Sequence, residues 1–241
     1  MNSSKSKPDT QQLNDWYARK AGNGLRKTVG YVRENGFFLF FIRLSYLMFF
    51  GIRNRFLELR LQAPKFRVGR SPKLAGLSHI TIGRSFSAGD CLWLEAVTRY
   101  GDEFYSPRIT IGDNVAMSDN VHIGSTLSIC IGDGVLLGSR VTLIDHNHGI
   151  YDGPNQSSPL QLPIYRRLSS EKPITVGKNT WIGDGVVVLP GTRIGEGSII
   201  GANSVVTGTI PANCIAVGSP ARPIRRYDFE VKEWVKWKPE N

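Results

Sequence analysis

The chain of 241 residues is 41% hydrophobic, enough for one large domain with its own core, and its three cysteines lack the Cys-x-x-Cys spacing of a disulfide framework or structural zinc site. Residues 1–72 hold 14 basic and 4 acidic side chains, whereas residues 73–241 hold 16 of each. A nucleic-acid-binding domain would carry its basic residues on its folded binding face, so this distribution argues against nucleic acid as a partner.

Residues 1–65 are predicted to form a basic, aromatic, helical leader. Its apolar run, Phe37–Ile52, begins too late for a cleaved signal peptide. Sixteen helical residues cover about 24 Å, short of a hydrocarbon core of about 30 Å, so we do not expect a membrane span. Two interpretations stay open. The helix lies in the lipid headgroup layer, held by the arginines that follow it, or it packs on the main domain or on a partner subunit.

Aliphatic residues recur at every sixth position from residue 111 onward. The hexads are IGDNVA, MSDNVH and IGSTLS, then, after the two-residue step Ile129–Cys130, IGDGVL, LGSRVT and LIDHNH. The same spacing returns at positions 176, 182, 188, 194, 200 and 206, and a looser version runs upstream through Val68, Leu74 and Ile80. A helix would need apolar residues about every 3.6 positions, and the recurring Gly and Asn would break it.

Each hexad is therefore predicted to be a short strand followed by a corner. Gly, Asp and Asn at the corners would take left-handed backbone angles that other residues avoid. Three hexads close one triangular coil, and successive coils stack at about 4.8 Å. The sequence predicts about six such coils by this spacing.

The pattern [Leu/Ile/Val]-Gly-x-x-[small]-x, the step Trp181-Ile182-Gly183 and the ending AVGSPARPIRR resemble the hexapeptide-repeat acyltransferases. Within that family the chain is similar to sugar and envelope-polysaccharide O-acetyltransferases, relatives of the galactoside and maltose acetyltransferases. The resemblance covers about residues 66–226. It implies an all-β, left-handed parallel β-helix, a homotrimer with sites between subunits, and acetyl-CoA as co-substrate with no metal. Residues 227–241 lie outside it and are predicted to form a short C-terminal helix.

The stretch LIDHNHGIYDG interrupts the repeat with two histidines. Acetyl transfer from a thioester to a hydroxyl needs a general base, and imidazole is well matched to neutral pH. The resemblance places this base at the end of the hexad before the loop, which is His148. His146 is the second candidate and could orient its neighbour or contact the acceptor. Asp145 either fixes a histidine tautomer or forms a turn, while His79 and His122 are predicted to be surface residues.

Residues 149–173 are too polar and too rich in proline to continue a coil, and so long a loop in a compact domain is usually functional. We expect this loop to shape the acceptor pocket, with Tyr151 as its first candidate contact. Tyr165, Arg166 and Arg167 are further candidates. The resemblance also implies an acceptor contact within Ser118–Asn120, with Ser118 and Asn120 as the residues of suitable type.

On the donor side the resemblance implies contacts to coenzyme A from the later coils. It selects Trp181, Asp184, Ala202, Thr207, Gly208, Arg222 and Arg225. Relatives carry a Thr-Lys pair where this chain has Thr207-Gly208, so one phosphate contact is either absent or supplied by Arg226. Trp181 either lines the groove or packs at a corner.

The main hypothesis is an acetyl-CoA-dependent O-acetyltransferase acting on a sugar hydroxyl of a lipopolysaccharide, capsule or exopolysaccharide precursor. We expect it in the cytoplasm, with the leader holding it at the inner membrane face. A small-molecule acceptor, such as an antibiotic or a free sugar, is the alternative within the same chemistry. Two other classes stay open: a zinc lyase like the γ-class carbonic anhydrases, which would need His122, His146 and His148 to converge, and a non-catalytic scaffold.

Overall fold

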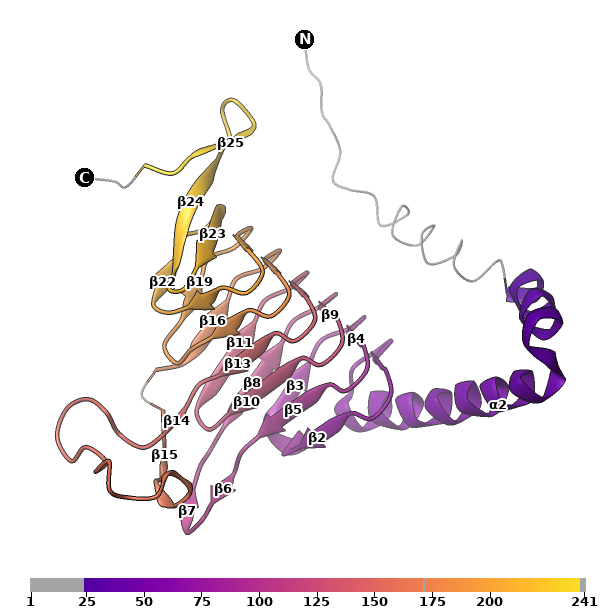
Figure 1. Ribbon diagram of the computed structural model, residues 1–241, viewed down its shortest axis with the longest axis horizontal. Coiled ribbons are helices and arrows are strands. Elements are labelled where there is room, and N and C mark those ends of the chain that lie inside the picture. Colours follow the sequence, from indigo (N-terminus) through magenta and orange to yellow (C-terminus); the bar gives the residue numbers. More distant parts are fainter. Residues whose placement is uncertain (1–23, 171, 239–241) are drawn as a thin grey trace. The chain divides into compact units, whose positions relative to one another are not determined.

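The computed structural model describes residues 24–170 and 172–238 (Figure 1). Chain contacts divide the molecule after Ile52 into two compact units. The second unit is a left-handed parallel β-helix, as predicted, in which the chain visits three faces in turn and returns to the first. Each face is a sheet whose neighbouring strands come from successive coils.

We name the faces A, B and C. Face A holds β1 (Arg67–Val68), β4 (Ser87–Ala88), β9 (Ala116–Met117), β12 (Leu136–Leu137), β17 (Trp181–Ile182), β20 (Ile199–Ile200) and β23 (Cys214–Gly218). Face B holds β2 (Lys73–Ala75), β5 (Trp93–Ala96), β10 (His122–Ser125), β13 (Thr142–Ile144), β18 (Val187–Val188) and β21 (Val205–Val206). Face C holds β3 (Ile80–Ile82), β8 (Arg108–Ile111), β11 (Ser128–Ile131), β16 (Ile174–Val176), β19 (Arg193–Ile194) and β22 (Thr209–Ile210). Faces B and C thus have six strands each, which confirms the expected six coils.

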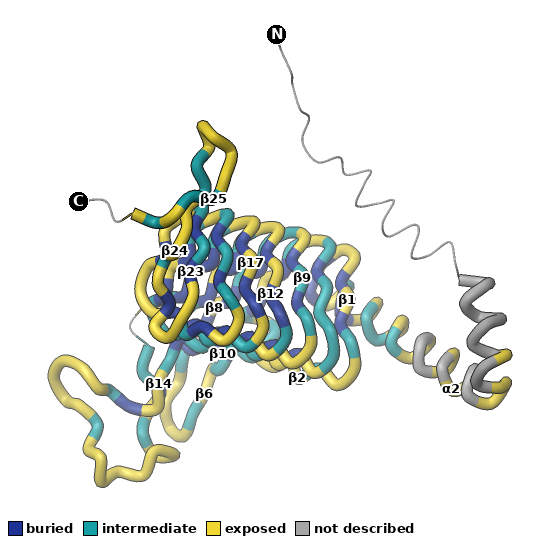
Figure 2. The backbone as a smooth tube through the Cα atoms, turned by 45° about the horizontal axis from the view of Figure 1, so that its top comes forward, coloured by how far each residue is buried: buried dark blue, intermediate teal, exposed yellow. Residues whose placement is uncertain are grey.

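Aliphatic ladders fill the interior of the β-helix. Figure 2 shows the buried residues recurring along successive coils. On face B the register stacks Leu74, Leu94, Ile123, Leu143, Val188 and Val206 in one column. Full burial of one such side chain contributes about 1.5–3 kcal/mol. On face C a strand can bury two side chains. In β11, Ile129 and Ile131 point inward and Cys130 between them points outward. This longer face explains the two-residue step in the hexad pattern.

The corners use the predicted residue types. Asn114 and Asn179 have φ of 57° and 55° at the corner from face C to face A. Asn120 and Asn203 have φ of 59° and 57° at the corner from face A to face B. Asparagine tolerates the left-handed region better than most residues, so the recurring Asn serves the turn itself.

Both ends of the β-helix are partly covered, which protects some of the open strand edges there. At the first coil, the last turns of α2 (Gly24–Leu61) bury Leu57 and Leu61, and Arg53 donates from Nη2 to the carbonyls of Val68 and Gly69 at 2.6 Å each. Gly36, with φ 78° and ψ 164°, interrupts α2. Among the described helices, none is long and apolar enough to cross a membrane.

At the other end the predicted C-terminal helix is wrong for the described residues up to 238. Instead, β24 (Ala221–Asp228) and β25 (Glu233–Lys236) continue face A as antiparallel strands. Tyr227 lies opposite Trp234, with ring centroids 5.3 Å apart. Aromatic and β-branched residues favour strands, and the free edge of β23 offers unpaired backbone groups to which they can bond.

Candidate active site

Two excursions leave the β-helix at the corner between faces B and C. The second coil carries the 97–107 hairpin, with β6 (Arg99–Tyr100) and β7 (Glu103–Phe104). The fourth coil carries the 145–173 excursion, with β14 (Asn147–His148), the short helix η2 (Pro163–Tyr165) and β15 (Leu168–Ser169). Figure 1 shows the two side by side. The hairpin was not predicted from the sequence, although the lost apolar spacing between Ala96 and Ile109 and the Gly101-Asp102 turn indicate it.

Asp145 begins the larger excursion and is fully buried. Its carboxylate accepts hydrogen bonds from Ser125 Oγ at 2.6 Å and from the backbone N–H groups of Thr126, Leu127 and Ser128 at 2.9, 3.1 and 2.8 Å. Burial acts to raise the pKa of Asp145, but the hydrogen bonds from His146, Ser125 and the backbone outweigh it, so this pKa lies below its usual range. Asp145 is therefore an anion in the folded protein, and its hydrogen bonds hold the corner of the previous coil.

His146 is held by that carboxylate. Its Nδ1 lies 3.2 Å from Asp145 Oδ1, and its side chain is only 11% exposed. A Cβ built on Gly124, in the coil below, would lie 3.7 Å from His146 Cε1 and 3.5 Å from His122 Nε2. Both distances are ordinary contacts, and the tight neighbour of such a Cβ would be Ile144 Cδ1 at 3.1 Å, so His122 and His146 both lie next to Gly124 on face B. A carboxylate on Nδ1 directs the other ring nitrogen, Nε2, away from the buried anion.

His148 is exposed and lies in β14, which pairs with β15 so that His148 is opposite Leu168. The Tyr100 ring from the 97–107 hairpin meets the imidazole edge-on, with centroids 5.2 Å apart at 78°. The Tyr151 hydroxyl donates a short hydrogen bond to the backbone carbonyl of His148 and accepts one from Arg166 Nη1 at 2.9 Å. The loop that carries His148 is thus ordered by contacts from both excursions.

A pocket of about 370 Å³ lies between the hairpin and the excursion. It is lined by Phe104, Tyr105, Ser106, Thr126, Leu127, Ile150, Arg167, Leu168, Ser169 and Ser170. Thr126 and Leu127 belong to the corner that binds Asp145, so the pocket adjoins the histidine-bearing segment. Arg167 gives it a positive charge. Arg166, in contrast, is used within the loop, where Nε and Nη2 donate to Gln161 O at 3.0 and 2.6 Å, and Tyr165 is exposed.

The other acceptor candidates and part of the donor set lie at a different corner, between faces A and B. Ser118 and Asn120 occupy this corner in the third coil. Trp181, Asp184 and Ala202 lie on or just before it in the fifth and sixth coils. Trp181 is 51% exposed on β17, whereas Asp184 Oδ1 accepts the Ser139 N–H at 2.8 Å and so stabilises the corner.

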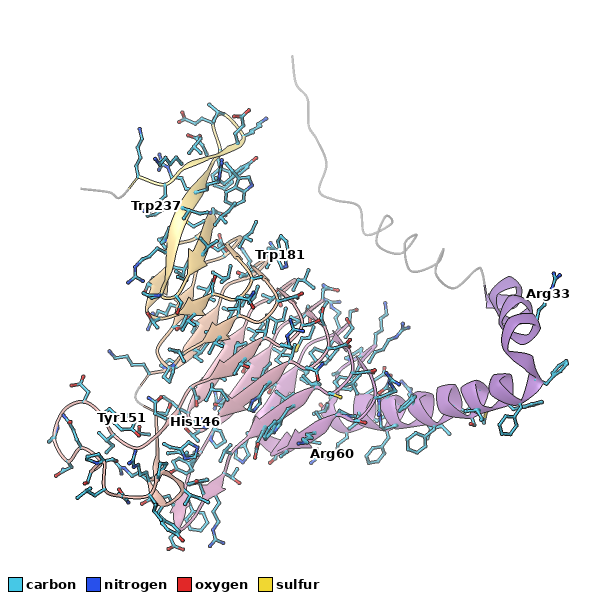
Figure 3. All side chains as sticks on the ribbon, viewed as in Figure 1. Arg33, Arg60, His146, Tyr151, Trp181 and Trp237 are labelled. Carbon is cyan, nitrogen blue, oxygen red and sulfur yellow. The ribbon has the colours of Figure 1, made fainter. Side chains whose placement is uncertain are left out.

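The remaining donor candidates lie elsewhere. Thr207 and Gly208 are exposed where face B meets face C, above the histidine segment along the same edge. Arg222 and Arg225 are exposed on β24, and Arg225 Nη1 donates to Trp234 O at 3.0 Å. The chain therefore brings His146, His148, Tyr151, Thr207 and Gly208 to one edge, but keeps Trp181, Asp184 and Ala202 on another. Figure 3 shows His146 and Tyr151 apart from Trp181.

The sequence predicted that His122 is an ordinary surface residue, and the structure shows otherwise. His122 is half-buried and stacks on Trp93 with centroids 4.1 Å apart. Burial lowers the pKa of His122, and the nearby Glu95 carboxylate acts in the opposite direction. His122, His146 and His148 each contact a different partner: Trp93, Asp145 and Tyr100. Within the residues that the structure describes, no three His, Cys, Asp or Glu side chains are grouped to hold a metal ion.

Comparison with known proteins gives a family match and several similar proteins. Residues 173–208 match the bacterial transferase hexapeptide (six repeats) family. A candidate O-acetyl transferase of lipopolysaccharide biosynthesis, WbbJ of Escherichia coli (strain K12), is 41% identical over 157 residues, covering 65% of this chain and 76% of WbbJ. The galactoside O-acetyltransferase of the same strain is 34% identical over 148 residues, covering 61% and 67%.

Among solved structures, AntD, an N-acyltransferase from Bacillus cereus in complex with dTDP and 3-hydroxybutyryl-CoA, superposes with a TM-score of 0.52. The match covers 68% of this chain and 81% of that one, at 19% identity. At this identity the likeness supports the fold, and the left-handed β-helix seen here agrees with it.

Proposed function

The chain belongs to the hexapeptide-repeat acetyltransferases, and from that premise we propose that it transfers an acetyl group from acetyl-CoA to a sugar hydroxyl, with His148 as general base. The observation that carries the proposal is the exposed imidazole of His148 at the break in the repeat, on a strand fixed by β15 and flanked by Tyr100. A general base must reach the acceptor hydroxyl, which an exposed ring can do.

In the proposed reaction the neutral imidazole of His148 takes the hydroxyl proton as the sugar oxygen attacks the thioester carbonyl carbon. The C–S bond of the tetrahedral intermediate then breaks, and the imidazolium returns its proton to the leaving thiolate. The products are the acetyl ester and coenzyme A. Transfer within a ternary complex requires no acyl-enzyme nucleophile.

His146 is the second candidate for the base, because a specific contact favours it. A carboxylate hydrogen-bonded to Nδ1 is the arrangement that orients a catalytic imidazole in other enzymes. Against this role, the His146 side chain is nearly buried, whereas His148 is exposed. We assign His146 to holding the segment Asp145–His148 in place.

We further propose that the enzyme is a homotrimer whose sites form between protomers. The support is the division of the candidate residues between two edges, which face B keeps apart within one chain. If the corner between faces A and B of one protomer lies against the histidine edge of the next, Trp181 and Asp184 would approach the neighbour's His148. A head-to-tail contact of this kind closes into a ring when its rotation is threefold.

For the acceptor we propose a precursor of a cell-envelope polysaccharide. The support is the lipopolysaccharide role in the name of the Escherichia coli relative and the positive charge of Arg167 in the pocket, which suits an anionic or phosphate-linked sugar. A small-molecule acceptor is the alternative. We also propose that the enzyme works at the cytoplasmic membrane face, because Phe49, Ile52, Phe56 and Leu59 on α2 are all more than 60% exposed in a strongly basic segment.

Two assays test this function together. Thiol release from acetyl-CoA is measured with nucleotide sugars, lipid-linked sugars and free sugars as acceptors, and product mass is read for the gain of one acetyl group. Envelope glycans from cells with and without the protein are then compared by mass spectrometry. Acetylation of free sugars or antibiotics alone would favour the small-molecule alternative.

A further inference from the structure

We propose that the 97–107 hairpin is a positioning element for His148, acting through Tyr100 and Tyr105. This inference rests on the proposed role of His148 as base. The hairpin belongs to the second coil and the histidine to the fourth, so their contacts are tertiary and join two separate breaks in the repeat.

Tyr105 acts on the strand that pairs with His148. Its hydroxyl donates to the backbone carbonyl of Leu168 at 3.1 Å and accepts from the backbone N–H of Leu168 at 3.0 Å. Leu168 is buried, with 5% of its surface exposed, and it lies opposite His148 in the β14–β15 pair. One tyrosine oxygen therefore satisfies both backbone polar groups of the residue that faces the base. Without it, these partly buried groups would lose this partner and would depend on solvent from the adjoining pocket, which weakens the hold on β15.

Tyr100 acts on the histidine ring and on the far limb of the excursion. Its ring lies edge-on to the imidazole of His148 at 5.2 Å, and its hydroxyl donates to the carbonyl of Ile164 at 2.9 Å. Ile164 belongs to η2, sixteen residues after His148 in the chain. Tyr100 thus connects the start of the excursion to its return, and limits how far the imidazole can turn.

The excursion needs this external support because its own secondary structure is small. β14 and β15 pair over two residues each, and the stretch between them is long and largely exposed. A base displaced by about 1 Å can lose about two orders of magnitude in rate. Fixing His148 from the second coil, whose strands are part of the packed β-helix, supplies the rigidity that the loop lacks.

The experiment uses full-length protein with Tyr105→Phe, which removes one oxygen, and Tyr100→Leu, which removes the ring edge. Tyr227→Phe is the matched control, because Tyr227 lies in β24 and its ring contacts are to Phe229 and Trp234. We expect kcat to fall about tenfold for Tyr105→Phe and about ten- to a hundredfold for Tyr100→Leu. KM for acetyl-CoA should stay unchanged in both, and the control should match the parent.

The same substitutions are then made in a His148→Ala background. If the tyrosines act through His148, they cause no further loss there, since residues that act as a unit are strongly non-additive. An equal fold-loss in both backgrounds, or unchanged kcat in the single variants with melting temperatures preserved, would overturn the inference. Full activity of His148→Ala alone would instead overturn the proposed base, so the two failures are distinguishable.

Discussion

Asp145 and His146 form a hydrogen-bonded pair, Nδ1 to Oδ1 at 3.2 Å, in which the carboxylate is fully buried and the ring nearly so. The same carboxylate accepts three backbone N–H groups and a serine hydroxyl from the coil below. This pair therefore joins the break in the repeat to the intact coil beneath it, and makes the start of the excursion a fixed point.

The first prediction concerns the contribution of Asp145 to the free energy of unfolding. Asp145→Asn replaces one acceptor oxygen by an NH2 group that faces donors, and should cost about 2 kcal/mol or more at pH 7, roughly 4–8 °C in melting temperature. Because the pKa of Asp145 is lowered in the folded protein, its stabilisation is present above the unfolded value of about 3.9 and disappears as the pH falls through the lower folded value.

Thermal unfolding followed by circular dichroism between pH 7 and pH 3 measures this difference. The gap between the parent and Asp145→Asn should be largest near neutral pH and should close below about pH 4. Asp102→Asn is the matched control, since Asp102 is fully exposed and makes one ion pair at 4.0 Å. A gap that stays constant down to pH 3 would show that the charge of Asp145 contributes nothing.

The second prediction separates the two histidines. His148→Ala should lower kcat by about 10²–10⁴-fold with little change in KM for acetyl-CoA, because general-base catalysis contributes on that scale. His146→Ala should cost less in kcat and more in melting temperature, because His146 holds the segment through Asp145. Steady-state thiol release gives both constants. The opposite order of kcat losses would make His146 the base.

The third prediction concerns assembly. If each site combines His148 of one protomer with Trp181 of its neighbour, then co-expressed His148→Ala and Trp181→Ala chains will form some intact sites. Random mixing of equal amounts gives about a quarter of the interfaces the right pairing. Selection with both tags removes the uniform trimers, and each mixed trimer then has one correctly paired interface in three. Activity of doubly tagged, co-purified trimers should therefore approach about a third of the parent value, while each variant alone stays nearly inactive. No recovery in mixed oligomers would place both residues in one chain's site.

The fourth prediction concerns the exposed face of α2. Full-length protein should sediment with vesicles that contain anionic lipid, and less with neutral vesicles or at high salt. Replacing Phe49, Ile52 and Phe56 by Ser should abolish vesicle binding while leaving kcat unchanged in detergent. If the same variant changes oligomeric mass and the parent does not bind vesicles, this face contacts another subunit instead.

The repeat could be predicted from the sequence because each hexad contains the residue types that its strand and its corner require. At least one aliphatic side chain turns inward per strand and Gly or Asn takes the corner, so Ile182 and Asn203 have roles that recur in the other coils. The larger excursion was predicted at residues 149–173, but in the structure it begins earlier, at Asp145 directly after β13, so that both histidines lie within it.

Contacts between separate breaks in the repeat were not readable. Nothing in the local sequence of Tyr105 indicates that its hydroxyl bonds to Leu168, 63 residues later. The C-terminal strands were predicted as a helix, which was wrong. Their strand conformation depends on pairing with the free edge of β23, and the local sequence does not show that pairing. For Asp145 the sequence left two roles open, a turn residue or a carboxylate that fixes a histidine tautomer. The burial of Asp145 decides between them, and burial could not be read from the sequence.

The most direct test of the account is acetyl transfer by the purified parent protein and its His148→Ala variant, with acetyl-CoA and a set of nucleotide-linked and lipid-linked sugars. Product masses and released thiol are followed together. We predict that the parent adds one acetyl group to a sugar acceptor in step with thiol release, and that His148→Ala, folded and of the same oligomeric mass, loses at least about a hundredfold in kcat. Undiminished transfer by His148→Ala, or thiol release by the parent with no acetylated sugar, would contradict it.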